Sequence, residues 1–433
     1  MVIIMEKKYL KRILDDILKE RLEMIGAVVI VGPKWSGKTT TAEKHAKSVL
    51  KLQDPDNRKS YLELAEIKPS LLLEGEKPRL IDEWQMAPVL WDAVRTSVDN
   101  LNEDGLYILT GSTSINEDEI MHSGTGRFNR LIMRPMSLFE SKESNGKISI
   151  MDLFDSPDMN IDGIKSELSI EDLIFASCRG GWPESLNKKT KKAQLFVASN
   201  YLSNICESDV SKVDGIKRDP KRVRIILQSY ARNISTLASN KTILKDVKSN
   251  FSNISEPTYY SYIDALTRLF VIDNIKGWNP NIRSSTSIRL SEKKEFIDPS
   301  IAVALLDLSP EMLIYDLNTF GFIFENLCIR DLNVYSSAVN GEISYYRDRN
   351  GLEVDCILQL KNGDYAFIEF KLGSSEIEKA AKNLLKLDKA IKKEINENKV
   401  NIKEPNFLAI ITSGEFAYTR KDGVKILPIG CLR

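Results

Sequence analysis

The sequence predicts an α/β protein in three parts: a parallel sheet between helices, a helical middle region, and a smaller second α/β domain. Three observations lead to this fold class. The glycine-rich loop Gly32–Thr39 stands between an apolar run and a helical pattern, and further apolar runs alternate with helical patterns after it. The last third of the chain follows the order helix, three strands, helix, strand. We expect domains at residues 1–178, 179–310 and 311–433.

Composition is typical of a globular protein, since 42% of the 433 residues are hydrophobic and 28% are charged. The formal net charge is zero, so the whole molecule carries no electrostatic signature of a nucleic-acid partner. No apolar run approaches the roughly 18 residues of a membrane span, and charged residues stand where a signal peptide needs an apolar core. Five cysteines without a C-x-x-C pair and only two histidines argue against a zinc site or a disulfide framework. We expect a cytoplasmic protein without a membrane partner.

An amphipathic helix is predicted over residues 5–24, ahead of the glycine-rich loop. Its apolar face repeats at helical spacing and comprises Leu10, Ile13, Leu14, Ile17 and Leu18. Two interpretations stay open: this helix lies near a bound base, or it only contributes to the core.

The loop reads GPKWSGKT and fits G-x-x-x-x-G-K-[ST] at every fixed position. The run Ala27–Val31 before it predicts a buried strand, and Thr40–Leu52 after it predicts a helix. This order is the context that a phosphate-binding P-loop requires, with Lys38 reaching the β- and γ-phosphates of ATP and the Thr39 hydroxyl holding Mg²⁺. We assign the nucleotide contacts to Gly32, Pro33, Lys34, Trp35, Ser36, Gly37, Lys38, Thr39 and Thr40.

The acidic part of the nucleotide site is predicted at Arg79–Glu83, after a candidate strand at Tyr61–Leu64. An acid at the carboxyl end of a strand facing the P-loop holds Mg²⁺ through water, and Asp82 fits that role. Glu83, next along the chain, would orient and deprotonate the attacking water.

A third strand, Leu106–Ser112, ends in small hydroxyl residues and is expected between the first two strands in space. Its end can place a polar side chain at the γ-phosphate, and both Thr110 and Ser112 are candidates for this sensor position. The segment that follows presents Arg127 on a loop, where an arginine would stabilise charge on the transferred phosphate. Arg130 is the second candidate.

The motifs RLIDEWQMAP, ILTGS, SGTGR and RPMSLFES, together with the run Arg179–Glu184 (RGGWPE), carry a family resemblance. In this order they resemble the AAA+-type ATPases that carry a C-terminal domain of unknown function (DUF4143), a bacterial and archaeal group distinct from hexameric unfoldases. The resemblance covers most of the chain and implies an enzyme that binds and hydrolyses ATP.

The middle of the chain changes from acidic at residues 140–172 to basic at residues 212–250. Helical patterns at 223–230, 237–244 and 258–269, followed by short strands at 270–272 and 288–290, predict a winged helix. Its recognition helix would expose the tyrosines of the run TYYSY to a nucleic-acid backbone. The other interpretation, of equal weight, is a domain that packs on the ATPase and contacts no nucleic acid.

The C-terminal third places acids and one lysine on neighbouring elements of the α-β-β-β-α-β order. Asp355 lies in one predicted strand, and Glu369 and Lys371 lie two apart in the next, so that they face the same side. Glu325 lies in the predicted helix before these strands. This arrangement resembles the PD-(D/E)XK nuclease fold, which implies Mg²⁺ held by Glu325, Asp355 and Glu369, with Asp355, Glu369 and Lys371 as catalytic residues.

Two functional hypotheses follow from the sequence. The first is an ATPase whose C-terminal parts bind or cut DNA, favoured because Glu83 and the Glu369–Lys371 pair are both present. The second is a nucleotide-controlled switch or regulator that binds a protein partner through an inactive nuclease-like domain. A homo-oligomer is compatible with either hypothesis.

Overall fold

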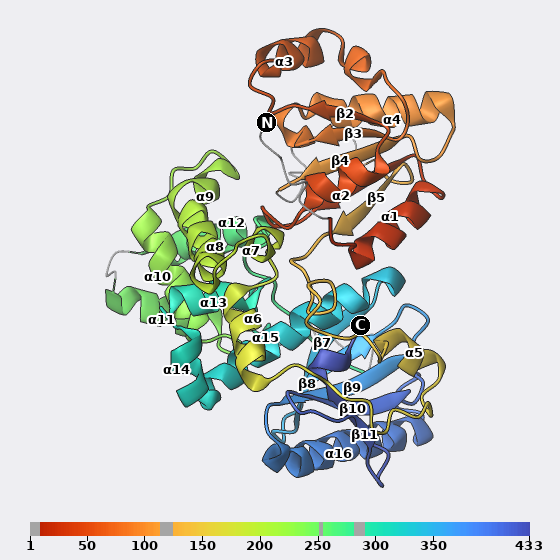
Figure 1. The fold of residues 1–433 in the computed structure, drawn as a ribbon, viewed down its shortest axis with the longest axis vertical. Helices are drawn as coiled ribbons and strands as arrows, with labels where there is room; N and C mark the ends of the chain where they lie inside the picture. Colours follow the sequence, from red (N-terminus) through yellow and green to blue (C-terminus); the bar gives the residue numbers. More distant parts are fainter. Residues whose placement is uncertain (1–8, 113–123, 251–253, 281–290) are drawn as a thin grey trace. The chain divides into compact units, whose positions relative to one another are not determined.

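The computed structural model describes residues 9–112, 124–250, 254–280 and 291–433 (Figure 1). Its contacts group the chain into two compact units. The P-loop unit comprises Lys11–Pro135 with Leu266–Phe270, and the second unit holds Met136–Ala265 and Val271–Arg433. The predicted boundaries after residues 178 and 310 stay predictions. No helix among the described residues is both long enough and apolar enough to cross a membrane.

The P-loop unit is built on a sheet of five parallel strands in the order β2-β3-β4-β1-β5. The strands are β1 (Ala27–Val31), β2 (Ser48–Lys51), β3 (Arg79–Asp82), β4 (Tyr107–Gly111) and β5 (Phe128–Ile132). β4 lies between β1 and β3, which confirms the predicted place of the third strand. β1 and β4 are buried along their whole length, as expected for the centre of a parallel sheet covered on both faces.

Helices cover both faces of this sheet (Figure 1). They are α1 (Ile13–Leu22), α2 (Lys38–His45), α3 (Arg58–Ile67) and α4 (Val89–Leu101), with the 3₁₀ turns η1 (Pro69–Leu73) and η2 (Trp84–Met86). α1 and α2 bury Leu14, Leu18 and Ala42 against one face. α3, η1 and α4 pack on the other face around the central strands. The predicted apolar face of the first helix is therefore part of the core.

Two predicted elements of the P-loop unit are wrong. The helix expected to continue to Leu52 ends at His45, and β2 follows it. In β2 the side chain of Val49 is 41% exposed while that of Leu50 is 3% exposed, which is the alternation of an edge strand. The strand expected at Tyr61–Leu64 is part of α3, whose buried Ala65 lies among charged positions at helical spacing.

Helices make up the middle of the chain. They are α5 (Ile150–Asp155), α6 (Ile170–Arg179), α7 (Pro183–Leu186), α8 (Lys191–Asn204), α9 (Val210–Lys212), α10 (Pro220–Ala231), α11 (Asn240–Asn250), α12 (Glu256–Arg268), α13 (Pro299–Leu305) and α14 (Pro310–Tyr315), with a π-helical turn at Ile205–Asp209. The predicted helical face of α10 is confirmed, because Val223, Ile226, Leu227 and Tyr230 are all buried.

The predicted wing falls partly outside the described residues, since 281–290 is not among them. Antiparallel bridges join Ile272 to Phe296 and Ile275 to Lys293, so the partner of this strand lies later in the chain than predicted. The expectation of exposed tyrosines on α12 is wrong for two of three. Tyr259 and Tyr262 are buried in the core, and only Tyr260 is exposed. The winged-helix assignment itself stays a prediction.

The second unit contains a mixed sheet in the order β11-β12-β10-β9-β8-β7-β6. The strands are β6 (Lys276–Gly277), β7 (Glu342–Arg347), β8 (Glu353–Gln359), β9 (Tyr365–Lys371), β10 (Phe407–Thr412), β11 (Tyr418–Thr419) and β12 (Lys425–Pro428). β7, β8 and β9 form an antiparallel meander, and β10 then runs parallel to β9 after the crossover helix α16 (Ile377–Asn396). With α15 (Leu317–Tyr335) ahead of the meander, the predicted α-β-β-β-α-β order is confirmed.

Segments far apart in the sequence join within the second unit. The Ser144 hydroxyl donates to the carbonyl of Leu432 at 2.6 Å, across 288 positions of sequence, and Ile148 forms a parallel bridge to the same residue. The backbone N–H of Gly181, from the RGGWPE run, donates to the buried Asp298 at 2.9 Å. Arg330 pairs with Asp298 at 3.0 Å, so this run is fixed by a buried ionic contact.

Candidate functional site

The P-loop between β1 and α2 adopts the backbone that its glycines allow. Gly32 has φ 147° and Gly37 has φ 100°, both in the region that side chains rarely adopt. A Cβ on Gly32 would lie 2.3 Å from the carbonyl oxygen of Met133, so only glycine fits there. The loop also contains Trp35 at φ 65°, and its indole is 41% exposed.

Lys38 lies buried at the first position of α2. Its ammonium donates to the carbonyl oxygens of Gly32 at 2.9 Å and Pro33 at 2.8 Å, which curls the loop around it. Burial lowers the pKa of Lys38 to about 8, although the nearby carboxylates of Glu83 and Asp82 partly oppose this. The Ser36 hydroxyl in the same loop is buried without a hydrogen-bond partner. The Lys38 ammonium and the free Ser36 hydroxyl belong to the same loop, and both are suited to bind phosphate oxygens.

An arginine that the sequence analysis missed supports this loop. Arg12 stands just before α1, and its guanidinium donates to the carbonyl oxygens of Ser36 and Arg134, each at 2.8 Å. On the same side, Asp15 accepts from His45 at 2.8 Å and so joins α1 to α2. The sequence showed only a charged residue at a helix start, which is the usual place for a solvated side chain.

Asp82 receives two hydroxyl groups at the carboxyl end of β3. Its Oδ1 accepts from the Thr39 hydroxyl at 2.7 Å and from the Thr110 hydroxyl at 2.5 Å. Strand register explains the second contact, because Asp82 lies directly opposite Thr110 in the β3–β4 pair. The three residues therefore meet beside the P-loop, and Asp82 stands at the carboxyl end of its strand.

Glu83 occupies a left-handed backbone position, at φ 55°, immediately after Asp82. For a residue other than glycine this conformation is uncommon and is often found where function requires it. The Glu83 carboxylate accepts from the Gln85 amide and from the Ser112 hydroxyl, the latter at 3.3 Å. The two sensor candidates thus serve different acids: Thr110 binds Asp82 and Ser112 binds Glu83.

A second cluster of charged residues lies on the mixed sheet. Lys371 of β9 places its ammonium 2.9 Å from Asp355 Oδ2 on β8 and 2.7 Å from Glu369 Oε2. The backbone N–H of Phe370 also donates to Asp355 at 3.0 Å. The two carboxylates therefore face the same side of the sheet, and Glu369 and Lys371 share that face as their spacing predicted.

Glu325 of α15 joins this cluster through a lysine that the sequence analysis did not identify. Lys293 is 1% exposed, and its ammonium pairs with Glu325 and lies 3.7 Å from Asp355 Oδ1. No group of three or more acids, histidines or cysteines among the described residues is arranged to hold a metal ion. In this cluster two ammonium groups lie among the three carboxylates. The donor set suits Mg²⁺, but a bound ion would have to displace a lysine.

Comparisons with known proteins were made for the whole chain. Residues 25–142 match the family model described as an AAA domain (AAA_14). Residues 170–312 and 320–432 match two domains of unknown function, DUF8612 and DUF4143. No match was found among curated proteins.

Solved structures of low similarity were also found. A Walker-type ATPase of Pyrococcus abyssi is 14% identical, with 67% of this chain and 94% of that chain covered and a TM-score of 0.41. A signal-transduction ATPase with a tetratricopeptide repeat sensor, from Pyrococcus horikoshii, is 14% identical, with 77% and 50% covered and a TM-score of 0.26. A DNA polymerase III gamma subunit-related protein from Thermotoga maritima is 12% identical, with 74% and 99% covered and a TM-score of 0.22.

The AAA model spans the sheet from before β1 to beyond β5 and includes the loop that surrounds Lys38. Residues 25–142 therefore match an AAA domain and contain the P-loop. The DUF4143 model covers most of α15, the meander and β10, which carry every residue of the second charged cluster except Lys293.

Arg127 is not brought to the P-loop of its own AAA-type domain. Its carbonyl accepts from the N–H of Ala27, at the start of β1, whereas the P-loop follows the other end of that strand. The four residue steps between these ends span about 13 Å. The Arg127 side chain instead pairs with Asp99 at 2.7 Å on the surface. Arg130 lies opposite Val29, midway along the same strand pair. Arg127 therefore lies away from the P-loop of its own chain, and its role at a phosphate stays a prediction.

Burial controls the ionisation of the acids in the DUF4143 region. It raises the pKa of Glu325 to about 7 and that of Glu369 to about 8, despite their paired lysines. Burial acts on Asp355 too, but Lys293 and Lys371 outweigh it and hold the Asp355 pKa well below its usual range. Near neutral pH the cluster therefore keeps a proton on one of its glutamates while Asp355 stays ionised.

This proton makes stability depend on pH. Because the pKa of Glu369 is raised in the folded state, folded Glu369 keeps a proton that the unfolded chain releases, so its contribution to stability is lost as pH rises from about 4.5 through about 8. Glu369→Gln removes this loss. We expect the melting temperature of the variant, relative to wild type, to rise steadily between about pH 5 and pH 9. Glu353→Gln, on the more exposed part of β8, serves as the control, and parallel curves for Glu369→Gln and wild type would refute the assignment.

Proposed function

We propose that the chain hydrolyses ATP in its AAA-type domain. The observation that carries this proposal is the meeting of Thr39, Asp82 and Thr110, with Glu83 held next to them. The Thr39 hydroxyl donates a hydrogen bond to Asp82. The lone pairs of the Thr39 oxygen therefore stay available to a metal ion. Thr39 and Asp82 would hold Mg²⁺, which neutralises charge on the phosphates when bound.

Each protein group then has a defined task. The Lys38 ammonium exchanges its loop carbonyls for β- and γ-phosphate oxygens and balances their charge. Thr110 keeps the Asp82 carboxylate in one orientation. Glu83 accepts a proton from the attacking water as the new P–O bond forms, and the bond from the γ-phosphorus to ADP breaks. Ser112 and Gln85 hold the Glu83 carboxylate in position.

The test is turnover of ATP by the purified full chain, with and without Mg²⁺ and with and without double-stranded DNA. The proposal expects phosphate release that requires Mg²⁺. Tight ATP binding without any phosphate release would contradict the ATPase proposal and favour a nucleotide-controlled switch. Stimulation by DNA would link the ATPase to a nucleic-acid partner.

A second function, phosphodiester cleavage in the DUF4143 region, is supported by the contact of one ammonium with two carboxylates. Asp355 and Glu369 would hold Mg²⁺ together with Glu325, and the ion would activate water when bound. Lys371 would balance charge on the phosphate. The position of Lys293 favours the other candidate, a regulator with an inactive site, because Lys293 already neutralises Glu325 and Asp355.

Salt dependence of DNA binding separates these two candidates. A nuclease or other DNA-binding ATPase should lose affinity steeply with salt, with log K falling linearly against log salt concentration. A regulator that binds a protein partner should show no such binding. Cleavage assays with Mg²⁺ and Mn²⁺ then decide whether bound DNA is cut.

We infer that any role of Arg127 in hydrolysis is exerted on another copy of the chain. Arg127 lies beside the start of β1, and the P-loop of its own chain follows the end of that strand. We expect Arg127→Ala protein to be impaired, and mixing it with Lys38→Ala protein to restore part of the activity. Turnover of wild type should also rise more than linearly with protein concentration. If mixing restores nothing, Arg127 plays no part at the phosphate and only pairs with Asp99.

A further inference from the structure

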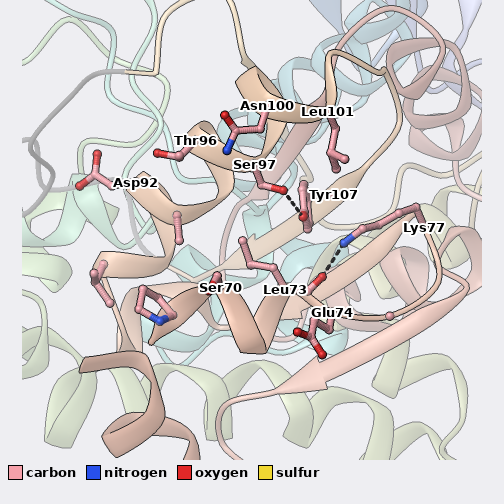
Figure 2. Close-up of a pocket in the computed structure, with 14 residues that line it drawn as sticks. Ser70, Leu73, Glu74, Lys77, Asp92, Thr96, Ser97, Asn100, Leu101 and Tyr107 are labelled. Carbon is pink, nitrogen blue, oxygen red and sulfur yellow. Dashed lines mark hydrogen bonds between the residues drawn. The ribbon is translucent and has the colours of Figure 1, made fainter. Parts of the chain in front are cut away.

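We propose that the AAA-type domain binds a small organic anion in a cavity separate from its P-loop. The cavity measures about 650 Å³, within the range of sites for small molecules. Its walls are η1, the loop that leads to Lys77, one face of α4, and Tyr107 at the start of β4 (Figure 2). No residue assigned to the nucleotide site lines it.

The cavity lies at the amino-terminal ends of the strands, whereas the nucleotide site lies at their carboxyl ends. Tyr107 begins β4 and pairs with Arg79, which begins β3. Asp82 and Thr110 stand at the other ends of the same two strands. A ligand in the cavity therefore leaves the P-loop accessible, and both sites can be filled at once.

Positive charge without a paired carboxylate marks one end of this cavity. The Lys77 ammonium donates to the carbonyl of Leu73 at 2.6 Å and lies 3.9 Å from the centre of the Tyr107 ring (Figure 2). Behind it, Arg79 donates to the carbonyl of Leu72 at 2.9 Å and to the Ser48 hydroxyl at 3.0 Å. Within the ranges that the structure describes, neither cation forms an ion pair.

Lys77 and Arg79 are half-buried, and the lack of a counter-charge raises the cost of removing them from water. Burial, together with the neighbouring Arg79, lowers the pKa of Lys77 to about 8. A carboxylate or phosphate group bound here would offset that cost and add a charge-assisted hydrogen bond. Two acids, Glu74 and Asp92, also line the cavity. Among the described residues Glu74 forms no ion pair with Lys77, and Asp92 lies near the start of α4, away from Lys77 (Figure 2).

The remaining wall suits the flat or aliphatic body of such a ligand. The lining face of α4 carries the small residues Ala93, Thr96 and Ser97, and the Ser97 hydroxyl bonds the Tyr107 hydroxyl at 2.7 Å (Figure 2). Leu73 and Leu101 add apolar surface. An anionic head at Lys77 with an apolar body along α4 therefore matches both the charge and the lining of the cavity.

The test uses a matched pair of probes, naphthalene-2-carboxylate and its neutral amide, titrated into the full chain by calorimetry. We expect the carboxylate to bind at least about tenfold more tightly than the amide, because only the carboxylate meets the charge of Lys77. Lys77→Met keeps the alkyl chain over Tyr107 and should remove this difference. Lys59→Met, on the exposed surface of α3, is the matched control and should retain it.

Two further variants separate the cavity from other sites. Lys38→Ala removes the cation of the P-loop, and carboxylate binding should persist in that variant. Thr96→Phe fills the cavity from an exposed helix position and should weaken the carboxylate at least about tenfold while Lys77 is intact. Equal affinity for acid and amide, loss of binding in Lys38→Ala, or unchanged binding in both Lys77→Met and Thr96→Phe would each overturn the proposal.

Discussion

Glu83→Gln is expected to lower the rate of ATP hydrolysis by about 10²- to 10⁴-fold while ATP binding is retained. The amide keeps the shape of the side chain and can still bond Ser112, but it cannot accept a proton from water. Lys38, Thr39 and Asp82 remain in place, so the nucleotide affinity should change little. Phosphate release and equilibrium binding of a fluorescent ATP analogue measure the two effects separately.

Lys38→Ala provides the complementary result. It removes the buried ammonium that the P-loop curls around, and nucleotide binding itself should be lost. Glu63→Gln, on the surface of α3, is the matched control for the Glu83 variant and should hydrolyse ATP at the wild-type rate. Equal turnover in Glu83→Gln and wild type would remove Glu83 from the mechanism.

Asp355→Asn is expected to abolish any cleavage of DNA while leaving ATP turnover at the wild-type rate. The carboxylate of Asp355 contacts both lysines of the cluster, so its loss takes away the only acid whose pKa is held low there. The affinity for a divalent ion should fall, and Lys371 should lose one of its two carboxylate partners. Divalent-ion binding by calorimetry and cleavage of a labelled duplex measure the two consequences.

Controls decide whether such a loss reflects the site or the fold. Asp364→Asn alters a carboxylate in the loop between β8 and β9 that pairs with Lys403, and cleavage should be unaffected. Lys371→Ala should weaken cleavage without changing ATP turnover, because the two sites belong to different units of the chain. Cleavage by Asp355→Asn at the wild-type rate would exclude the site, provided that the variant melts near the wild-type temperature.

Local patterns predicted the parts of both sites that depend on spacing along one or two elements. The P-loop motif and the acids at the end of β3 are defined by a few adjacent residues, and the structure brings Asp82 to Thr39 and Thr110 beside that loop. Likewise, the two-residue period of a strand placed Glu369 and Lys371 on one face. The edge strand β2 was missed because Val49 and Leu50 fit a helical repeat as well as an alternating one.

Contacts between distant segments could not be predicted in this way. Lys293 lies in a charged run that resembles an exposed turn, yet its pairing with Ile275 carries it into the interior beside Glu325. The place of Arg127 could not be predicted either, since only the register of β5 against β1 reveals which end of the strands it lies beside. The burial of Tyr259 and Tyr262 is likewise not predictable, because a helical pattern alone does not show which face meets the core.

The contact between Ser144 and Leu432 has a consequence for the order in which the protein is made. These residues lie 288 positions apart, and at about 5–20 residues per second the ribosome needs on the order of 15–60 s to travel from one to the other. The strands of the P-loop unit all lie within the first 132 residues, so they are synthesised before that interval begins. The backbone N–H groups of Asn145 and Ile148 have no partner until Gly430 and Cys431, whose carbonyls accept from them, have been made.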